Sequence, residues 1–298
     1  MKDIKLSIII PTYERTKDFA EILNVINKII ENLSYVEEML IVDDNRNKEF
    51  KKYTINSQAT LKKFRCLTTN HRGSAAARNF GIRSAKGNVI LFLDDDILPS
   101  IDSINNHYNY HQKNRGDNKC LVGKVITPKK ISLNNSFTRN VDEQNLQFGK
   151  QQLSGIVDFR YFYTCNVSMK KNFMLKHGLF NEIFKDALYD DIELAYRLEK
   201  KGLQIYFDKK NIVEHFKQYD YLSLTRRYKM MGYYAKKLLK LHPELSNSFI
   251  NLKPTIKEYL LIFTHPFLNV LRAINVNYFE ALLIKSGATK YFFIGLNS

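Results

Sequence analysis

The 298-residue sequence is poor in cysteine and has no tryptophan, and these shortages narrow the classes of protein that it can encode. Its three cysteines, Cys66, Cys120 and Cys165, lie far apart and form no CxxC pair, so we expect neither a disulfide framework nor a zinc site. This cysteine usage predicts a reducing cytoplasm. No apolar run reaches the roughly 20 residues of a spanning helix, and the run that follows Met1 is too short for a secretory signal.

Carboxylates are also in the minority, because the sequence has 46 lysines and arginines but only 30 aspartates and glutamates. Its formal net charge is therefore +16. Such a charge predicts an anionic partner, and nucleic acid, a membrane surface or a phosphorylated substrate would each satisfy it. Many of the basic residues follow residue 195, which favours one basic face. A hydrophobic content of 44% fits a soluble globular protein.

The segment Val89–Pro99 contains the most informative pattern, an apolar run that ends in Asp94, Asp95 and Asp96. The run has the length of a strand buried on both faces. Adjacent carboxylates repel one another, and a divalent cation that is shared with a phosphate relieves this repulsion. We therefore predict a metal and phosphate site here, with a solvated acidic strand end as the alternative.

Two earlier strands are expected to end beside these carboxylates. Residues 5–10 are rich in β-branched side chains and precede Pro11 and Thr12, residues 16–33 have helical spacing, and residues 38–42 form a second strand that precedes Asp44. A βαβ unit of this kind places both strand ends on the same rim of the sheet. The three segments should therefore surround one crevice.

A third strand, residues 64–69, leads into a turn and a helix that begins near Ser74. With Ser74 as its N-cap, this helix would direct its N-terminus, Arg72 and Arg78 at the crevice, where a diphosphate would bind. The alternative is that Arg78 is an ordinary surface residue. Neither GxGxxG nor GxxxxGK[ST] occurs in this stretch.

The middle of the chain carries weaker patterns. They predict a helix over 100–114, a strand over 120–126, a surface loop or lid over 127–154, a strand over 156–167 and a short helix over 171–177.

A second acidic cluster begins the helical segment 189–202. Asp190 and Glu193 have the spacing of a capping box, which is a purely structural explanation. Asp191 is not needed for a cap, however, and the strand that follows leads to His215. A histidine after a strand could complete the coordination of a metal that Asp96 holds, although a lone histidine is more often structural.

The tail, residues 219–298, differs in character from the rest. It combines a basic and aromatic helix with two strongly apolar stretches, the first of which Pro266 breaks. This combination suits a helix in a membrane interface, a contact with a second subunit, or a helical appendage with a solvated basic face.

Taken in order, these blocks resemble the family 2 glycosyltransferases, which transfer a sugar from a nucleotide diphosphate with inversion. The resemblance covers roughly residues 5–240 and rests on the joint order of several short motifs. They are Ser7–Tyr13, Ile41–Asp44, Asn70–Gly81, Leu93–Asp96, Asn166 before the segment 170–180, Asp190–Leu194 with Arg197 and Gly202, and His215.

The resemblance implies an α/β fold, a GT-A-like nucleotide-binding sandwich with a mostly parallel central sheet and a C-terminal helical extension. Residues 1–218 would form the catalytic domain, with a nucleotide-sugar-binding half (1–100) and an acceptor-side half (101–218). Residues 219–298 would form the basic, amphipathic extension.

The resemblance also implies a role for each motif residue. The donor would contact Pro11, Thr12, Glu14, Asp44, Arg72, Arg78, Asp94 and Asp95. Asp96 and His215 would bind Mn²⁺ or Mg²⁺, Asp191 would be the catalytic base, and Asp190 and Asn166 would lie on the acceptor side. The donor would be a UDP-sugar, and the acceptor a glycan, a lipid-linked intermediate or a peptide, reached in the cytoplasm or at the inner face of the membrane.

The sequence departs from the family pattern at three positions. The family usually has Glu at the place of Asp190, Asp at the place of Glu193, and often Asn at the place of Glu14. Acceptor positioning and one edge of the donor site are therefore expected to differ. No Gln-x-x-Arg-Trp motif of processive synthases is present, which favours a single transfer over polymerisation. A non-catalytic nucleotide-sugar-binding protein and a basic nucleic-acid-binding protein are the alternatives.

Overall fold

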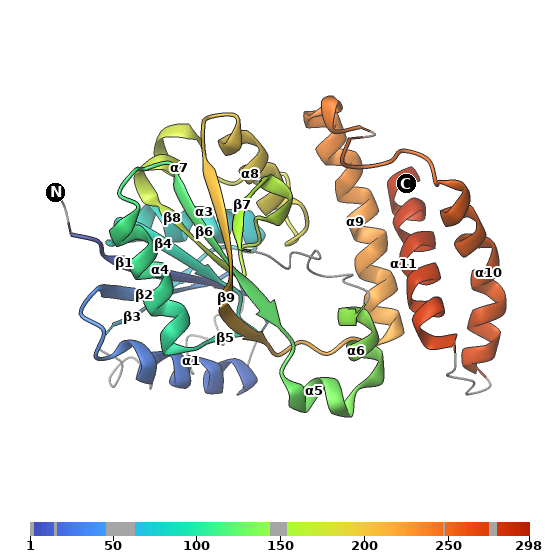
Figure 1. The fold of residues 1–298 in the computed structure, drawn as a ribbon, viewed down its shortest axis with the longest axis horizontal. Coiled ribbons are helices and arrows are strands. Elements are labelled where there is room, and N and C mark those ends of the chain that lie inside the picture. The colour runs from blue at the N-terminus through green and yellow to red at the C-terminus, as the bar shows by residue number, and fades with distance from the viewer. Residues whose placement is uncertain (1–2, 15–16, 46–62, 144–153, 247, 274–278) are drawn as a thin grey trace. The chain divides into compact units, whose positions relative to one another are not determined.

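The structure is a computed structural model that describes residues 3–14, 17–45, 63–143, 154–246, 248–273 and 279–298 (Figure 1). The chain divides into two compact units. Unit 1 comprises Met1–Ile126 and Gln151–Phe216, and unit 2 comprises Thr127–Lys150 and Lys217–Ser298.

Unit 1 is built around one mixed sheet, in the order β3-β2-β1-β4-β8-β6-β9-β5, with β7 also paired to β9. The strands are β1 (Leu6–Thr12), β2 (Val36–Asp43), β3 (Phe64–Thr68), β4 (Val89–Leu93), β5 (Ile97–Pro99), β6 (Lys119–Ile126), β7 (Gly155–Val157), β8 (Asn166–Lys170) and β9 (Gln204–His215). The first four strands pair in parallel, as does β6 with β9, whereas β8 runs antiparallel to both of its neighbours. The predicted α/β fold class is confirmed, with parallel pairing concentrated in the N-terminal half of the sheet.

The unbroken apolar runs of β1 and β4 are explained by burial on both faces of the sheet. Every residue of β4 is buried, and Ile8, Ile9 and Ile10 of β1 are fully enclosed. Among the described residues of this unit, the α-helices are α1 (Lys17–Ile30), α3 (Ser74–Ser84), α4 (Ile101–Lys113), α7 (Lys171–His177) and α8 (Asp190–Glu199). Side chains of α3, α7 and α8 join one large core cluster with those of β1, β2 and β4.

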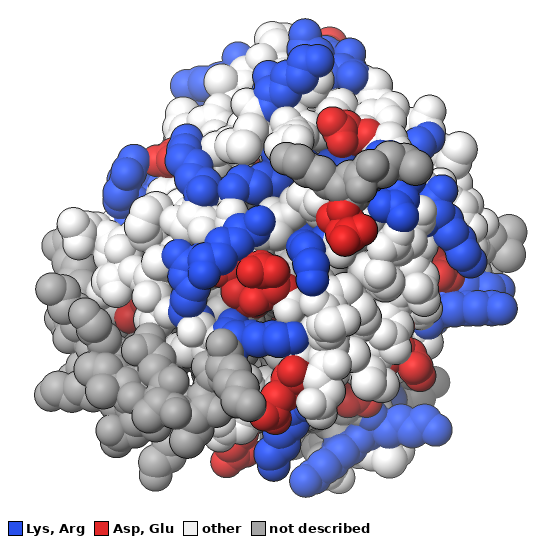
Figure 2. Space-filling model, turned by 90° about the vertical axis from the view of Figure 1, so that its left-hand side faces the viewer, with Lys and Arg blue, Asp and Glu red and all other residues white. Residues whose placement is uncertain are grey.

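The face of unit 1 that Figure 2 shows carries lysines and arginines dispersed among carboxylates and neutral side chains. The basic residues on this view therefore form no single patch among the atoms described there.

The predicted strand over 156–167 is wrong for most of its length. The structure has β7, a short 3-10 helix η1 (Phe159–Tyr161) and then β8, which starts only at Asn166. Asp158 explains the interruption, because its side chain accepts a hydrogen bond from the backbone N–H of Arg160 at 3.0 Å and turns the chain.

Unit 2 is helical and contains α5 (Lys129–Asn134), α6 (Ser136–Glu143), α9 (Tyr221–Leu241), a 3-10 turn η2 (Pro243–Leu245), α10 (Ile256–Ala273) and α11 (Glu280–Asn297). Two glycines let α9 and α11 cross closely. A Cβ atom on Gly232 would lie 1.9 Å from the Phe292 carbonyl oxygen, and one on Gly295 would lie 1.8 Å from that of Lys229. Small residues are therefore required where these helices touch.

Two further predictions fail in unit 2. The loop expected over 127–154 contains α5 and α6, while residues 144–153 lie outside the described residues. Val141 of α6 packs with Leu224 and Ile284, so contacts remote in sequence support a short helix that local pattern does not reveal. Pro266, which was expected to break an apolar run, lies within α10. Of the helices in the described ranges, none is long and apolar enough to cross a bilayer.

Candidate active site

The carboxyl ends of β1 and β4 meet, as the sequence predicts. The hydroxyl of Thr12 donates a hydrogen bond of 2.9 Å to the Asp95 carboxylate. Pro11 lies in the β1 ladder opposite Val42, and Glu14 follows β1 with a left-handed backbone (φ 52°). These predicted donor residues therefore lie along one strand end and its turn.

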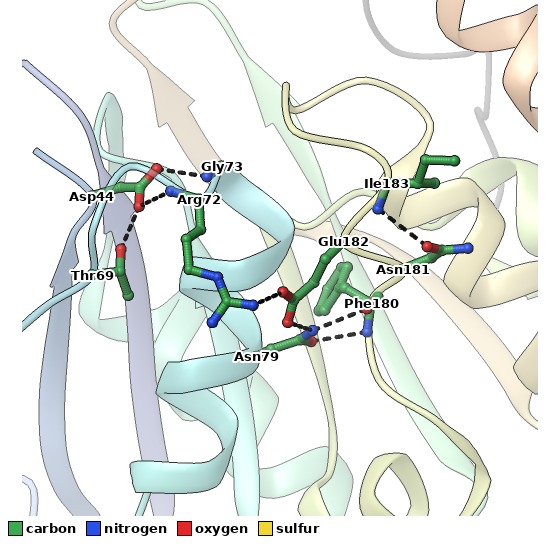
Figure 3. A network of polar contacts seen from close by, with 9 residues as sticks. All are labelled: Asp44, Thr69, Arg72, Gly73, Asn79, Phe180, Asn181, Glu182 and Ile183. Atoms are coloured by element: carbon green, nitrogen blue, oxygen red, sulfur yellow. Dashed lines mark hydrogen bonds and ion pairs between the residues drawn. The ribbon is translucent and has the colours of Figure 1, made fainter.

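Asp44, at the end of β2, organises the turn that leads into α3 (Figure 3). Its carboxylate accepts backbone N–H groups from Arg72 at 2.8 Å and Gly73 at 2.7 Å, and also the hydroxyl of Thr69. Both carboxylate oxygens are thus engaged by the protein. The predicted hydrogen bond from a base to Asp44 would be accepted by a side chain whose position is already fixed.

The start of α3 differs from the prediction that Ser74 caps it. Gly73 is the N-cap, with φ 96°, and Ser74 is the first helical residue. Only glycine fits here, because a Cβ atom would lie 2.4 Å from the Lys185 carbonyl oxygen and the backbone conformation is left-handed. The N–H of Ser74 donates to that same carbonyl at 2.9 Å, so this end of α3 is joined to the segment before α8.

Arg78 links two of the predicted acidic clusters. Its guanidinium donates to the Asp190 carboxylate at 2.8 Å and to the Asp94 carboxylate at 2.9 Å. Arg78 is only 1% exposed, so the alternative that it is a surface residue is wrong. Because removal of one partner from a buried ion pair leaves a charge without compensation, Arg78 holds β4 and α8 together.

Arg72 has a different environment, on the exposed side of the α3 turn. It forms a 2.6 Å ion pair with Glu182, whose other oxygen accepts a hydrogen bond of 3.0 Å from Asn79 (Figure 3). Asn79 in turn donates to the Phe180 carbonyl at 2.9 Å and accepts its N–H at 2.9 Å. The sequence analysis missed Glu182, which lies in an unpatterned loop.

Asp191 begins α8 beside Asp190 and is half-buried. Burial, followed by repulsion from Asp190, raises the pKa of the Asp191 carboxyl from 3.8 to about 7, against the opposing effect of Arg78. A carboxyl with this pKa exchanges protons readily near neutral pH.

The capping-box explanation of this acidic cluster is wrong. Asp190 bonds to Arg78, and Glu193 forms a bidentate pair with Arg197 at 2.7 and 2.9 Å. The N-cap of α8 is Tyr189, in a left-handed conformation (φ 64°). With Glu14 and His71 (φ 54°), it is one of three non-glycine residues in the described chain with positive φ, and all three lie in the loops of this site. Such strain concentrates at functional sites.

Asp96 and His215, the predicted metal ligands, are in contact, with 3.2 Å between His215 Nε2 and Asp96 Oδ1. β5 and β9 bring them together, since Ile97 pairs with His215. A carboxylate oxygen and an imidazole nitrogen are both ligands that Mn²⁺ accepts, so the chemistry of this pair is compatible with a small divalent cation. Within the described part of the chain, no three His, Cys, Asp or Glu side chains cluster as a metal site.

Asn166, predicted on the acceptor side, is fully buried at the junction of three strands. Its amide donates to the carbonyls of Lys124 and Asn211, each at 3.2 Å, and its Oδ1 lies 2.9 Å from His107 Nε2. The register of β6 and β9 shifts after Gly123, and Asn166 occupies this bulge. A Cβ atom on Gly123 would lie 2.2 Å from the Asn166 amide nitrogen.

The buried histidines of this junction, His107 and His111, were also missed. Their spacing of four on the predicted helix places them on one face, which is the signal that could have identified them. Burial lowers their pKa values to about 4 and about 3, so both stay neutral near pH 7.

Comparison with known proteins agrees with this geometry. A family model described as Glycosyl transferase family 2 matches residues 7–184. The poly(ribitol-phosphate) beta-N-acetylglucosaminyltransferase TarP of Staphylococcus aureus (strain N315) is 25% identical over 230 residues, covering 74% of this chain and 67% of TarP. An uncharacterized glycosyltransferase of Haemophilus influenzae is 30% identical over 232 residues, covering 66% of this chain and 90% of that protein. The chondroitin synthase of Escherichia coli is 27% identical, and the match spans only 32% of its length.

Two solved structures share the fold at 14% sequence identity. The structure of GalNAc-T7 with UDP, GalNAc and Mn²⁺ superposes with a TM-score of 0.56 over 93% of this chain and 57% of that chain. S. aureus TarS superposes with a TM-score of 0.53 over 98% of this chain and 55% of that chain. Since the family model matches more than half of its length, this chain belongs to glycosyl transferase family 2 and is a glycosyltransferase of the GT-A fold.

Proposed function

We propose that this glycosyltransferase moves one sugar from a nucleotide-diphosphate donor to an acceptor hydroxyl, with inversion and with the aid of a divalent cation. One observation carries the proposal. Acidic residues from remote segments converge at one end of the sheet, where Arg78 joins Asp94 to Asp190 and where Asp96 meets His215. Asp191, the adjacent carboxyl with a pKa of about 7, is the proposed base.

The donor half of the site would be formed by the ends of β1, β2 and β4. The donor would lie against Pro11, Thr12 and Glu14, with Asp44 at the base and Asp94 and Asp95 at the ribose and sugar. Thr12 supports this assignment, because it fixes Asp95 through a 2.9 Å hydrogen bond. Arg72, on the exposed α3 turn, is the proposed contact of the diphosphate, whereas Arg78 would act through Asp94 and Asp190.

The donor proposed first is a UDP-sugar, with an N-acetylhexosamine as the sugar. The structure of GalNAc-T7 contains UDP, GalNAc and Mn²⁺, and the name of TarP specifies N-acetylglucosamine transfer. These are properties of the two similar proteins. They are the reason why UDP-N-acetylhexosamines are the first donors to test.

Asp96 and His215 would hold the cation, which when bound offsets negative charge on the departing diphosphate. Their spacing of 3.2 Å supports this role. An ion of the Mg²⁺ type usually takes one or two protein carboxylates and completes its shell with substrate phosphates and water.

The transfer itself requires a base on the acceptor side. The acceptor oxygen attacks the anomeric carbon on the face opposite the nucleotide, the bond from that carbon to the phosphate oxygen breaks, and the electron pair leaves with the diphosphate. Asp191 takes the proton of the acceptor hydroxyl. Because Arg78 fixes the neighbouring Asp190, the base is held in place before the acceptor arrives.

The acceptor proposed is a glycan, a lipid-linked intermediate or a peptide, reached on the cytoplasmic side during assembly of a cell-surface polymer. An anionic acceptor is favoured, because the chain has a net charge of +16 and TarP, by its name, modifies poly(ribitol phosphate). A single transfer is proposed because the processive-synthase motif is missing from the sequence.

The decisive test is donor hydrolysis and donor binding with a panel of nucleotide sugars, each with Mn²⁺, with Mg²⁺ and with chelator. We expect a UDP-N-acetylhexosamine to raise the melting temperature and to release UDP only with the cation. Asp191→Asn should bind that donor normally and lose transfer to an acceptor. Normal transfer by Asp191→Asn would refute the assigned base, and no signal from any donor would refute the proposed reaction.

A further inference from the structure

α10 exposes an apolar stripe that unit 2 does not cover. Its members are Ile256 (84% exposed), Tyr259 (56%), Leu260 (62%), Phe263 (83%), Phe267 (66%) and Val270 (59%). Relative to Ile256 they stand at positions 3, 4, 7, 11 and 14, which places them along one face of the helix. Contiguous exposed apolar side chains of this size mark an interaction surface.

The opposite face of α10 is anchored, so the helix cannot rotate to bury the stripe. His265 is buried between Tyr221 and Ser286, with its Nε2 3.0 Å from the Tyr221 hydroxyl and its Nδ1 3.2 Å from the Ser286 hydroxyl. Leu268 is packed with Tyr221 and Leu283. Within unit 2, α11 lies between α9 and α10 and contacts both (Figure 1). These contacts hold the stripe away from α11.

Cations stand at the N-terminal end of the stripe, where Lys253 and Lys257 are exposed. Arg272, near the other end of α10, belongs to the anchored face, with its guanidinium carbon 4.4 Å from the centre of the Tyr221 ring. Glu258 is the acidic residue of α10, and it accepts hydrogen bonds of 2.7 Å from the N–H and hydroxyl of Thr255. Residues 217–298 contain twelve lysines and arginines against four carboxylates.

We infer that the α10 stripe docks on an anionic lipid membrane, with the helix lying in the interface and Lys253 and Lys257 at the lipid headgroups. An exposed apolar face could bind either a second copy of this chain or a lipid membrane, and the charge of the segment favours the membrane. A second copy would bring an equally basic segment against this one, which like-charge repulsion opposes, whereas anionic headgroups attract it. The inference concerns a surface of unit 2 and does not depend on the proposed donor, cation or base.

The test is co-sedimentation of the full chain with two kinds of vesicle. One is made of phosphatidylcholine alone, and the other contains about one third phosphatidylglycerol, which is anionic. We expect binding to the anionic vesicles that weakens as salt rises. Phe263→Glu with Phe267→Glu should weaken it at least tenfold, since each phenylalanine would no longer enter the apolar layer. Lys253→Glu with Lys257→Glu should weaken it by about fivefold or more for each cation.

Leu133→Glu is the matched control, because Leu133 is 74% exposed in α5 of the same unit and lies outside the stripe. It should leave vesicle binding unchanged. Thermal unfolding should be the same for all variants, since the altered side chains are exposed. The inference is overturned if the native chain ignores anionic vesicles at low salt, or if the Phe263 and Phe267 double variant binds them as well as the native chain. It is also overturned if the native chain forms dimers that the double variant splits and neither binds lipid.

Discussion

Asp191→Asn should remove the proposed catalytic base and make the protein more stable. The side chain is half-buried beside Asp190, and burial with this repulsion raises its pKa from 3.8 to about 7. An acid whose pKa is higher in the folded state keeps its proton longer when folded, so its effect is a loss of stability as pH rises from about 4 to about 7. Asparagine resembles the protonated carboxyl and avoids that loss.

The magnitude follows from the size of the shift. About three pKa units, at about 1.4 kcal/mol each, give an upper limit of about 4 kcal/mol above pH 7, and water at the half-exposed carboxyl reduces it to about 2–4 kcal/mol. For a chain of this size, whose entropy of unfolding is about 0.6 kcal/mol/K, that gain corresponds to a rise in melting temperature of roughly 3–6 °C.

The assay is thermal unfolding at pH 5 and pH 8, without divalent cations, of the native chain, Asp191→Asn and the control Asp117→Asn. Asp117 is exposed in the turn between α4 and β6, so its replacement should leave the melting temperature unchanged at both pH values. The gain from Asp191→Asn should be larger at pH 8 than at pH 5. A variant less stable than the native chain at pH 8, or a gain independent of pH, would refute the reasoning. In the native enzyme, kcat/KM should rise with pH through about 7 as the base loses its proton.

Three further changes test other parts of the structure. Arg78→Met should lower the free energy of unfolding in urea by about 3–5 kcal/mol, because the buried Asp190 would lose its partner and the partly exposed Asp94 its ion pair. Equal stability would contradict the structural role of the buried Arg78–Asp190 pair. His215→Ala should raise the Mn²⁺ concentration for half-maximal activity at least tenfold while saturating Mn²⁺ restores the rate; an unchanged Mn²⁺ dependence would remove His215 from the proposed ligands. Gly232→Ala should lower the melting temperature and reduce the free energy of unfolding by about 1–3 kcal/mol, because its Cβ would overlap the Phe292 carbonyl oxygen. Gly155→Ala, whose Cβ meets open space, is the control, and equal effects of the two changes would argue against the close crossing of α9 and α11.

The sequence was most informative at the strand ends, where the order of the strands determines which polar side chains lie close together. Apolar runs that end in carboxylates predict both the parallel strands and the rim on which Thr12 and Asp95 meet, because parallel strands share the orientation of their ends. The contact of Asp96 with His215 was expected from the resemblance to family 2 glycosyltransferases, because a lone histidine near a strand end is by itself more often structural.

The remaining features depend on contacts that no local pattern encodes. The position of Arg78 on a small-residue helix does not reveal that it reaches Asp94 and Asp190, because this depends on how α8 packs over the sheet. Asn166 stays a predicted acceptor-side residue, and its burial in the β6–β9 bulge follows from a register shift that the sequence does not display. The helices α5 and α6 are too short for periodicity to identify.

The anchoring of Asp190 by Arg78 has a consequence for the order of events in a catalytic cycle. The start of α8 is tied to β4 through a buried guanidinium, so the two acidic clusters move as one body. If Asp191 is the base, as proposed, the free energy of donor binding is not consumed in placing it, and a shortened donor should weaken affinity more than it slows the transfer step. Adaptation to new acceptors is easiest in the loops around this fixed body, where substitutions leave the triad intact.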